Sequence, residues 1–405
     1  MRIPLLSLSL AAALSLVAED WPRFRGPNGD GVSPNPIATK LDAASVRWAV
    51  DLPGRGLSSP VISGDRLFVT CSSGPRQDRL HVRCLRVADG SLLWERQFWA
   101  TGRTMTHEKI CGAVPTPVLD GNRVFALFSS NDCVALDFDG NLLWYRGLGR
   151  DYPNASNSLG MSSSLVVAEG TLVVQIENDS ESFAAGLDPA DGTNRWKVER
   201  PRRSNWTSPT LIRGKDGKTL AVIQSSKGVV AIDPKTGATV WNYDQGASTA
   251  PSTTVSGGRL YVPSNGLTVL EPAGAGEPPR QAWRSAQLRP GTASPVVVGD
   301  LVLVVSDSGI LTAGSVLDGK RLWQLRLKGE SSSSTVTATP VAAGGHLYCV
   351  NEAGVVQVVK LGATEGTVVS SLELGQPVLG TPSIAQGSLF VRSDGKLWRI
   401  GGALN

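Results

Sequence analysis

The chain has 405 residues, of which 18% are charged, and its formal net charge is only +4. This small and scattered excess of basic residues excludes the strongly basic surface that nucleic-acid-binding proteins use. The 45 glycines and 25 prolines indicate a turn-rich chain of short β-strands and exclude a mainly helical protein.

The first residues predict a secretory signal peptide. Arg2 is followed by a short apolar run that ends at Ala18. This run is too short for a convincing transmembrane helix, and no cysteine follows it, so neither a membrane span nor a lipobox anchor is expected. We therefore expect a signal peptide over residues 1–18, an N-terminal extension over residues 19–44 and a periplasmic or secreted location.

Internal repetition begins shortly afterwards, with a period close to the length of a four-stranded propeller blade. A small residue followed by proline opens most units, and Ser164-Leu165 takes the same position without the proline. The remaining openings are Ser59-Pro60, Thr116-Pro117, Ser208-Pro209, Ala250-Pro251, Ser294-Pro295, Thr339-Pro340 and Thr381-Pro382. Each unit then alternates short apolar segments with glycine turns, as four antiparallel strands require.

A tryptophan near the end of most units follows a glycine by four residues. The glycine permits the positive φ of a tight hairpin turn, and the tryptophan can pack against the neighbouring blade. In the seventh unit Gly366 leads to Ser370, so the tryptophan is absent. The tryptophans expected to dock blades together are Trp48, Trp94, Trp144, Trp196, Trp241, Trp283 and Trp323.

The last unit supplies only three strands, and Trp398 falls in the third of them. The segment from Val46 to Val50 can supply the missing strand and close the ring, which leaves no open sheet edge. The sequence thus predicts an all-β, eight-bladed β-propeller over residues 45–401, as a monomer. Seven blades is the alternative if the irregular seventh unit is not a blade.

These repeats resemble the quinoprotein, or PQQ-like, propeller repeat over roughly residues 45–400. The fullest copy runs from Ala231 to Trp241 and matches the pattern Ala-x-Asp-x-x-x-Gly-x-x-x-Trp. That family contains PQQ-dependent alcohol dehydrogenases and also non-enzymatic scaffolds such as BamB. The leader from Trp21 to Val32 resembles the start of secreted PQQ-like repeat proteins, a likeness that implies no activity.

The candidate binding residues lie in the long polar loops of units one to four, which should gather at one end of the channel. Asparagines, acids and arginines in such a cluster suit an oxygen-rich cation site or an anionic ligand. The alternative is a solvated rim whose polar groups cap turns and pair with one another. The candidates are His107, Glu108, Asn154, Asn157, Asn178, Asp179, Glu181, Arg202, Arg203 and Trp206.

Three functions follow from the resemblance and the fold. We favour the hypothesis of a binding scaffold. Such a protein would hold a protein partner of the cell envelope and would need neither a cofactor nor catalytic residues. A PQQ- and calcium-dependent dehydrogenase is an alternative, although the chain lacks the adjacent cysteines and the Cys-x-x-Cys-His motif of such enzymes. A polysaccharide-binding or -degrading propeller is a third, which rests on fold analogy alone.

Five cysteines leave at least one without a partner in the chain. Cys71 and Cys84 fall in consecutive predicted strands, at a register where they could face each other in a disulfide. Small buried thiols are the alternative. The spacing of cysteines and histidines does not match a zinc site, so no metal is expected.

Overall fold

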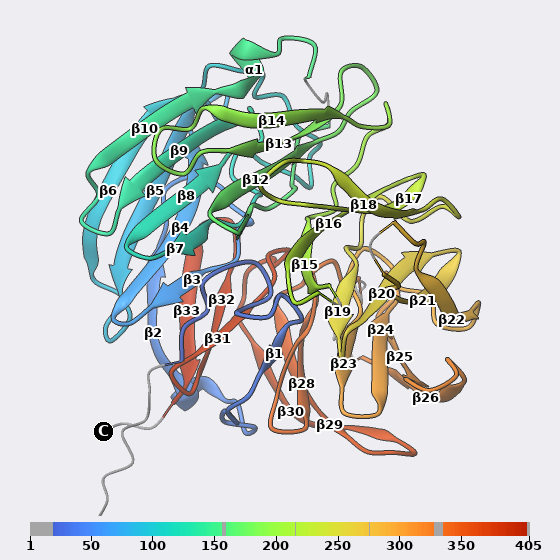
Figure 1. Ribbon diagram of the computed structural model, residues 1–405. Helices are drawn as coiled ribbons and strands as arrows, with labels where there is room; N and C mark the ends of the chain where they lie inside the picture. Colours follow the sequence, from blue (N-terminus) through green and yellow to red (C-terminus); the bar gives the residue numbers. More distant parts are fainter. Residues whose placement is uncertain (1–18, 156–158, 215, 275, 328–334, 403–405) are drawn as a thin grey trace, which may run out of the picture.

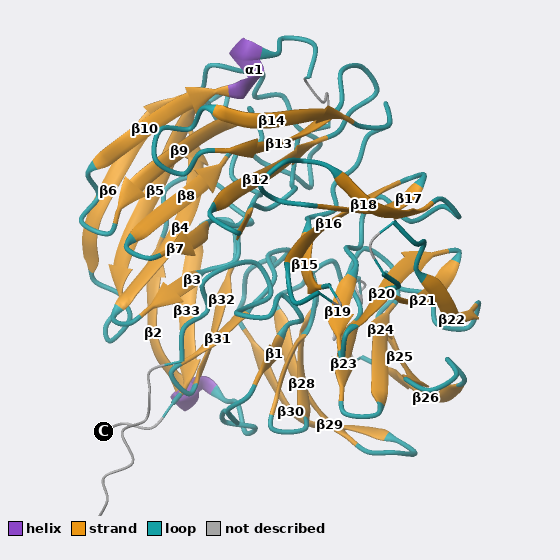
Figure 2. Ribbon diagram, in the orientation of Figure 1, coloured by secondary structure: helices purple, strands orange, loops and turns teal. Residues whose placement is uncertain are grey.

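A computed structural model describes residues 19–155, 159–214, 216–274, 276–327 and 335–402. The expected signal peptide lies outside these residues. Eight antiparallel sheets are arranged around a central axis (Figure 1), which confirms eight blades and rules out seven. Strands dominate the fold (Figure 2), and the two helices described are the 3-10 turn η1 (Ala43–Ser45) and α1 (Leu148–Asp151). Neither is long enough to span a membrane.

Each of the first seven blades takes four consecutive strands, the first of which lines the channel. Blades 1 to 3 contain β3 (Val61–Ser63), β4 (Arg66–Ser73), β5 (Arg79–Arg86) and β6 (Leu92–Trp99); β7 (Val118–Asp120), β8 (Arg123–Leu127), β9 (Asp132–Asp137) and β10 (Leu142–Gly147); β11 (Val166–Ala168), β12 (Thr171–Ile176), β13 (Phe183–Leu187) and β14 (Asn194–Glu199). Blades 4 and 5 contain β15 (Thr210–Arg213), β16 (Thr219–Ser225), β17 (Gly228–Ile232) and β18 (Thr239–Tyr243); β19 (Thr254–Ser256), β20 (Arg259–Ser264), β21 (Gly266–Glu271) and β22 (Arg280–Ser285). Blades 6 and 7 contain β23 (Val296–Val298), β24 (Leu301–Val305), β25 (Ile310–Ser315) and β26 (Arg321–Arg326); β27 (Val341–Ala343), β28 (His346–Val350), β29 (Val355–Leu361) and β30 (Gly366–Glu373).

Blade 8 is built from both ends of the chain, as the sequence predicted. It combines β31 (Ser383–Ala385), β32 (Ser388–Arg392) and β33 (Lys396–Gly401) with β2 (Val46–Asp51) from the beginning. The β2 strand pairs antiparallel with β33, so that Val50 lies opposite Leu397. Because the outermost strand comes from the N-terminal side, separating the ends of the chain would break a four-stranded ladder.

Six of the seven predicted docking tryptophans lie against a glycine of the next blade, whereas Trp241 meets no glycine among the described residues. A Cβ added at Gly90 would lie 2.9 Å from Cε3 of Trp48, and one added at Gly140 would lie 2.7 Å from Cδ2 of Trp94. Trp48 Nε1 also donates a hydrogen bond to Val87 O at 3.0 Å. The same glycine contact recurs for Trp144, Trp196, Trp283 and Trp323 with Gly192, Gly237, Gly319 and Gly366.

A ring of hydroxyls joins the blades around the channel. In each of seven steps, the backbone N–H of one ring residue donates to the hydroxyl of the ring residue in the next blade, at 2.9 to 3.1 Å. The members are Ser59, Thr116, Ser164, Ser208, Ser252, Ser294, Thr339 and Thr381. In blade 5 the ring residue is Ser252 rather than the expected Ala250, because alanine has no acceptor oxygen for this bond.

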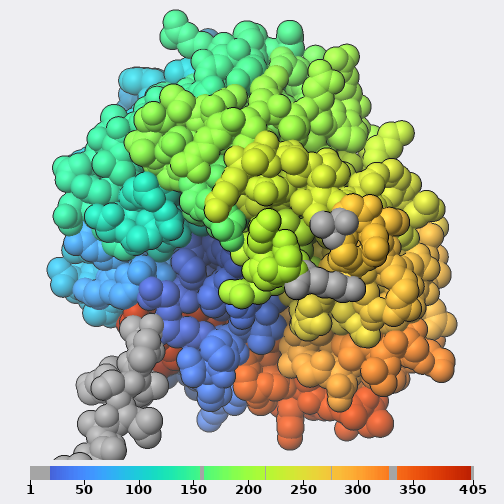
Figure 3. Space-filling view, viewed as in Figure 1, coloured from blue at the N-terminus to red at the C-terminus, as the bar shows by residue number. Residues whose placement is uncertain are grey.

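The residues before β2 cross one end of the channel, in contact with the inner strands. Trp21 pairs with Ile62 of blade 1, and β1 (Val32–Ser33) runs parallel to β27 of blade 7. Between them Arg25 is buried, and its guanidinium donates to Thr254 Oγ1 at 2.6 Å and to Thr253 O at 2.7 Å. Burial lowers the pKa of Arg25 to about 10. In the space-filling view the dark blue part of the chain lies near the centre of the face (Figure 3).

All five cysteines are buried free thiols, so the possible Cys71–Cys84 disulfide is wrong. In the β4–β5 ladder Cys71 lies opposite His81, whereas Cys84 lies opposite Phe68. The two thiols therefore project from opposite faces of the sheet, because adjacent positions alternate between faces. They belong to separate hydrophobic clusters.

Candidate functional site

The channel widens into a cavity of about 460 Å³ at the end opposite the N-terminal segment. Phe24 of that segment and the eight ring residues line the cavity from inside the channel. Further residues come from the loops that lead from one blade to the next and from the loops between second and third strands. These are Leu57, His107, Lys109, Ile110, Val114, Ser162, Trp206, Ala250, Thr292, Asp307, Thr335, Thr337, Glu352 and Leu379. The cavity thus lies where the sequence placed the loop-rich end.

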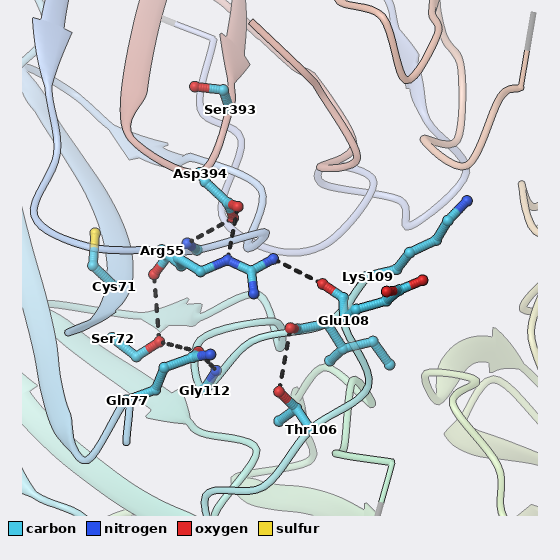
Figure 4. Close-up of polar contacts among 12 residues, drawn as sticks. Arg55, Cys71, Ser72, Gln77, Thr106, Glu108, Lys109, Gly112, Ser393 and Asp394 are labelled. Carbon is cyan, nitrogen blue, oxygen red and sulfur yellow. Dashed lines mark hydrogen bonds and ion pairs between the residues drawn. The ribbon is translucent and has the colours of Figure 1, made fainter. Parts of the chain in front are cut away.

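A polar network fixes the loop after blade 1 over the cavity (Figure 4). Arg55 forms an ion pair with Asp394 at 2.8 Å and donates to Glu108 O at 3.1 Å. Below it, Gln77 Oε1 accepts hydrogen bonds from Gly112 N at 2.8 Å and from Ser72 Oγ at 3.2 Å. The middle of the loop, at Glu108 and Gly112, is therefore held by Gln77 of blade 1 and by Arg55, which is itself paired with Asp394 of blade 8.

This loop carries a lysine that pairs across the cavity with blade 7. Lys109 Nζ lies 2.9 Å from Glu352 Oε2 and 3.0 Å from Oε1. Glu352 follows β28 and also accepts a hydrogen bond from Thr337 Oγ1. Because the ammonium is about half exposed, while the carboxylate is mostly buried, this pair orders the loop more than it stabilises the fold.

Two of the predicted site residues, His107 and Trp206, line the cavity. Trp206 is positioned by a hydrogen bond from its Nε1 to Gly160 O at 2.9 Å, and its backbone N–H donates to Thr249 O at 2.8 Å. His107 N donates to Leu159 O at 3.1 Å. Glu108 is exposed beside the cavity, and its contribution to the network is its carbonyl oxygen.

A shallower hollow of about 340 Å³ on the rim brings together three other candidates, Asp179, Arg202 and Arg203. Asp179 accepts hydrogen bonds from Ser204 N at 3.2 Å and from Ser204 Oγ at 2.8 Å. Among the described residues, neither Arg202 nor Arg203 has an ion-pair partner. Their guanidinium groups are exposed.

The other candidates are engaged within the fold. Asn178 is buried and caps its own loop, with Nδ2 donating to Glu181 O at 2.6 Å. Glu181 forms an ion pair with Lys197 at 2.8 Å. Asn154 is exposed, and its carbonyl accepts from the backbone N–H of Glu181 at 3.3 Å. Asn157 lies outside the described residues.

The carboxylate of Glu177, next to Asn178, is also engaged within the fold. Glu177 is buried against Arg200, with Nε to Oε1 at 2.8 Å, and it accepts a further bond from Asn205 Nδ2 at 2.9 Å. Burial raises the pKa of Glu177, and the Arg200 charge opposes that rise. Within the described part of the chain, no group of three or more His, Cys, Asp or Glu residues is placed to hold a metal. The oxygens of Glu177 are therefore already engaged by side chains of the fold.

Several cavity residues were not identified from the sequence. Lys109 and Glu352 lie in loops of blades far apart in the chain, so their pairing has no local signal. Phe24 belongs to the N-terminal extension, which lacks the repeat pattern. The ring hydroxyls had a signal, because their positions recur once per blade, but the small size of these residues explained that recurrence equally well.

Comparison with known proteins shows which proteins share this fold. The family model described as outer membrane protein assembly factor BamB matches residues 32–185. The chain is 18% identical to the structure of BamB from Moraxella catarrhalis, with a TM-score of 0.63 over 89% of this chain and 98% of that one. It is 14% identical to quinohemoprotein alcohol dehydrogenase from Comamonas testosteroni, with a TM-score of 0.64 over 96% and 81%. The protein is an eight-bladed β-propeller, and its residues 32–185 are similar to the BamB family model.

Two curated relatives carry different descriptions. Polyvinylalcohol dehydrogenase from Sphingopyxis sp. (strain 113P3) is 26% identical over 249 residues, which cover 50% of this chain and 36% of that protein. Outer membrane protein assembly factor BamB from Moranella endobia (strain PCIT) is 24% identical over 173 residues, which cover 41% and 39%. Each match therefore spans little more than a third of the relative. The comparisons include both a dehydrogenase and an assembly factor.

Proposed function

We propose that this protein is a binding scaffold that holds a protein partner of the cell envelope on the loops of blades 1 to 4. The observation that carries the proposal is the exposure of three large apolar side chains, one at the end of β6 and two in the loops after blades 1 and 2. Trp99 is 64% exposed, Met105 60% and Leu159 40%. Large apolar groups on a rim mark interaction sites when they lie together with arginine.

The arginines of the rim hollow extend this surface. Leu159 lines the same hollow as Arg202 and Arg203, so an apolar side chain and two cationic side chains lie side by side there. We name Trp99, Met105, Leu159, Arg202 and Arg203 the rim surface. Aromatic and arginine side chains provide most of the binding energy in many interfaces, which favours a partner segment with apolar residues and a carboxylate.

The matched part of the BamB family model supports the same location. Its residues 32–185 include blades 1 and 2 and, in blade 3, β11, β12 and the start of β13, and they contain Trp99, Met105 and Leu159. A leader over residues 1–18 would deliver the protein to the periplasm or the exterior. There it would act as a monomer, with the partner providing any attachment to the membrane.

Site-specific photo-cross-linking in cells tests the proposal. A photoreactive residue at Trp99 or Met105 should form an adduct with one discrete envelope protein. The control position is Leu317, which is 78% exposed in the turn between β25 and β26, at the other end of blade 6. Replacing Arg202 and Arg203 together with alanine should lower the adduct yield severalfold. Equal adducts from positions 99 and 317, or none from position 99, would refute the rim surface.

The dehydrogenase alternative is supported by the match to polyvinylalcohol dehydrogenase and disfavoured by the engaged donors around Glu177. Titration of the purified protein with PQQ and calcium, followed by calorimetry and absorbance, separates the two functions. Tight one-to-one binding would move the assignment to a quinone enzyme and justify an alcohol screen. Absence of binding leaves the scaffold as the better explanation.

A further inference from the structure

The central cavity has a donor-rich wall that the scaffold function does not use. All eight ring residues line it, and each of them is more than nine-tenths buried. A hydroxyl has one hydrogen to donate and two lone pairs to accept with. Seven of the ring oxygens already accept a backbone N–H, and Ser59 Oγ has no hydrogen-bond partner among the described residues.

The hydrogen of each ring hydroxyl is still available to donate a hydrogen bond. Within the described residues, none of the eight ring hydroxyls donates to a protein acceptor. A buried donor without a protein acceptor requires water or a ligand. The ring therefore surrounds the channel with donors that suit an oxygen-rich molecule on the axis.

The rest of the wall restricts the charge of that molecule. Lys109 is already paired with Glu352, and Asp307 adds a second carboxylate to the wall. One lysine against these two carboxylates leaves one net negative charge, so an anionic ligand would be repelled. A neutral ligand meets no such cost.

Apolar side chains complete the wall, and the aromatic residues Phe24 and Trp206 are the largest of them. Aromatic faces stack on the C–H face of a sugar ring or of a carbon chain, while the hydroxyl edge needs hydrogen-bonding partners. A volume of about 460 Å³ lies within the usual range of small-molecule sites. The N-terminal segment covers the far end of the channel, so a ligand would enter from the loop-rich end.

We propose that the central cavity binds a neutral polyhydroxylated molecule, a hexose or a hexitol. Its hydroxyls would accept from the ring, and its C–H face would lie against Trp206. This site is independent of the rim surface, because it requires no protein partner.

Calorimetry and ligand-observed NMR with sorbitol, glucose and gluconate test the site. Sorbitol and gluconate have the same carbon chain and differ mainly in one carboxylate. We expect saturable binding of sorbitol or glucose and at least severalfold weaker binding of gluconate. Equal or tighter binding of gluconate, or of PQQ with calcium, would overturn the assignment of a neutral ligand.

Blocking variants test the location. Ala250 is exposed on the cavity wall, so Ala250→Trp should preserve the fold and reduce binding at least tenfold. Thr292→Trp, also exposed on the wall, provides a second blocking variant if the first does not fold. The matched control is Ala363→Trp, at an exposed alanine in the β29–β30 hairpin, which should bind as the wild type does. Unchanged binding in a folded blocking variant, or no saturable binding by the wild type, would refute the proposal.

Discussion

Ser370 Oγ accepts a hydrogen bond from Leu41 N at 2.7 Å and donates one to Leu41 O at 2.9 Å. Ser370 stands on β30 beside the β-bulge, where β26 of the preceding blade has its docking tryptophan, Trp323. The missing tryptophan of blade 7 is therefore replaced by a backbone contact with the N-terminal extension. A serine fits there because an extended segment needs both a donor and an acceptor at close range.

Ser370→Ala removes both of these hydrogen bonds and leaves the amide and carbonyl of Leu41 without their side-chain partner. We expect a loss of about 1–3 kcal/mol in stability, seen as a lower midpoint of thermal unfolding by circular dichroism. Ser371→Ala is the control, since Ser371 is exposed on the other face of β30. An identical midpoint for both variants would show that the Leu41 contact does not stabilise the fold.

The tryptophan–glycine contact between blades 1 and 2 can be isolated with two alanine substitutions. Gly140 has φ +83° and lies against Trp94, whereas Gly121 has φ +60° and open space around its Cα. Both substitutions strain the backbone by about 1–2 kcal/mol. Gly140→Ala should cost about 1–3 kcal/mol more, because Trp94 must move. Denaturant unfolding measures the loss of stability in both variants. Equal losses would mean that the indole of Trp94 moves aside without cost.

Arg25 holds the N-terminal segment across the channel. Arg25→Ala removes its bonds to Thr253 and Thr254 and should release the segment. Limited proteolysis should then cleave within residues 19–33 at least several times faster than in the wild type. Arg23→Ala is the control, because the hydrogen bonds of Arg23 within the described part of the chain stay in its own turn, to Gly26 O and Pro27 O. A wild-type cleavage rate in Arg25→Ala would show that Trp21 and β1 suffice.

The ionisation of Glu95 should make the stability of the folded protein depend on pH. Although burial opposes ionisation, hydrogen bonds from His81 and Gln97 and the charge of Arg83 lower the pKa of Glu95 below its usual range. A carboxyl whose pKa is lower in the folded state stabilises above the unfolded pKa, and this contribution is lost as the pH falls through the folded pKa. The wild type should exceed Glu95→Gln by about 1 kcal/mol at neutral pH and by much less in strong acid.

Glu373→Gln is the matched control for that titration, since Glu373 is exposed at the end of β30. Its stability relative to the wild type should vary little with pH. Urea unfolding across the acid range gives both curves. A constant difference between the wild type and Glu95→Gln would contradict the role of the Glu95 charge.

The cysteines should be unreactive in the native protein. Burial raises the pKa of Cys133 and Cys349 to about 12 and that of Cys111 to about 11. Because the thiolate is the reactive form, a thiol reagent should modify none of the five until the protein unfolds, and then all five. Fewer than five reactive thiols after unfolding without reductant would indicate a disulfide and contradict the Cys71 and Cys84 geometry.

The blades could be predicted because each one repeats the same local pattern. Strand alternation, the hairpin glycine and the tryptophan four residues later are all short-range features, and their period matches one blade. The closing strand at Val46–Val50 followed from counting the strands of the last unit. Even the absent tryptophan at Ser370 was visible, although its replacement by Leu41 was not.

The site depended on contacts that no local pattern encodes. His107 and Trp206 both line the cavity, while Asn178 is buried and caps its own loop. The path of each loop decides whether its polar side chains reach the cavity. Arg25 reaches Thr254 across more than half of the chain. The sequence by itself determined the blade, because a repeating pattern buries the same groups in every unit. The tertiary structure decided the site, because closing the ring is what brings loops of distant blades and the N-terminal segment to one axis.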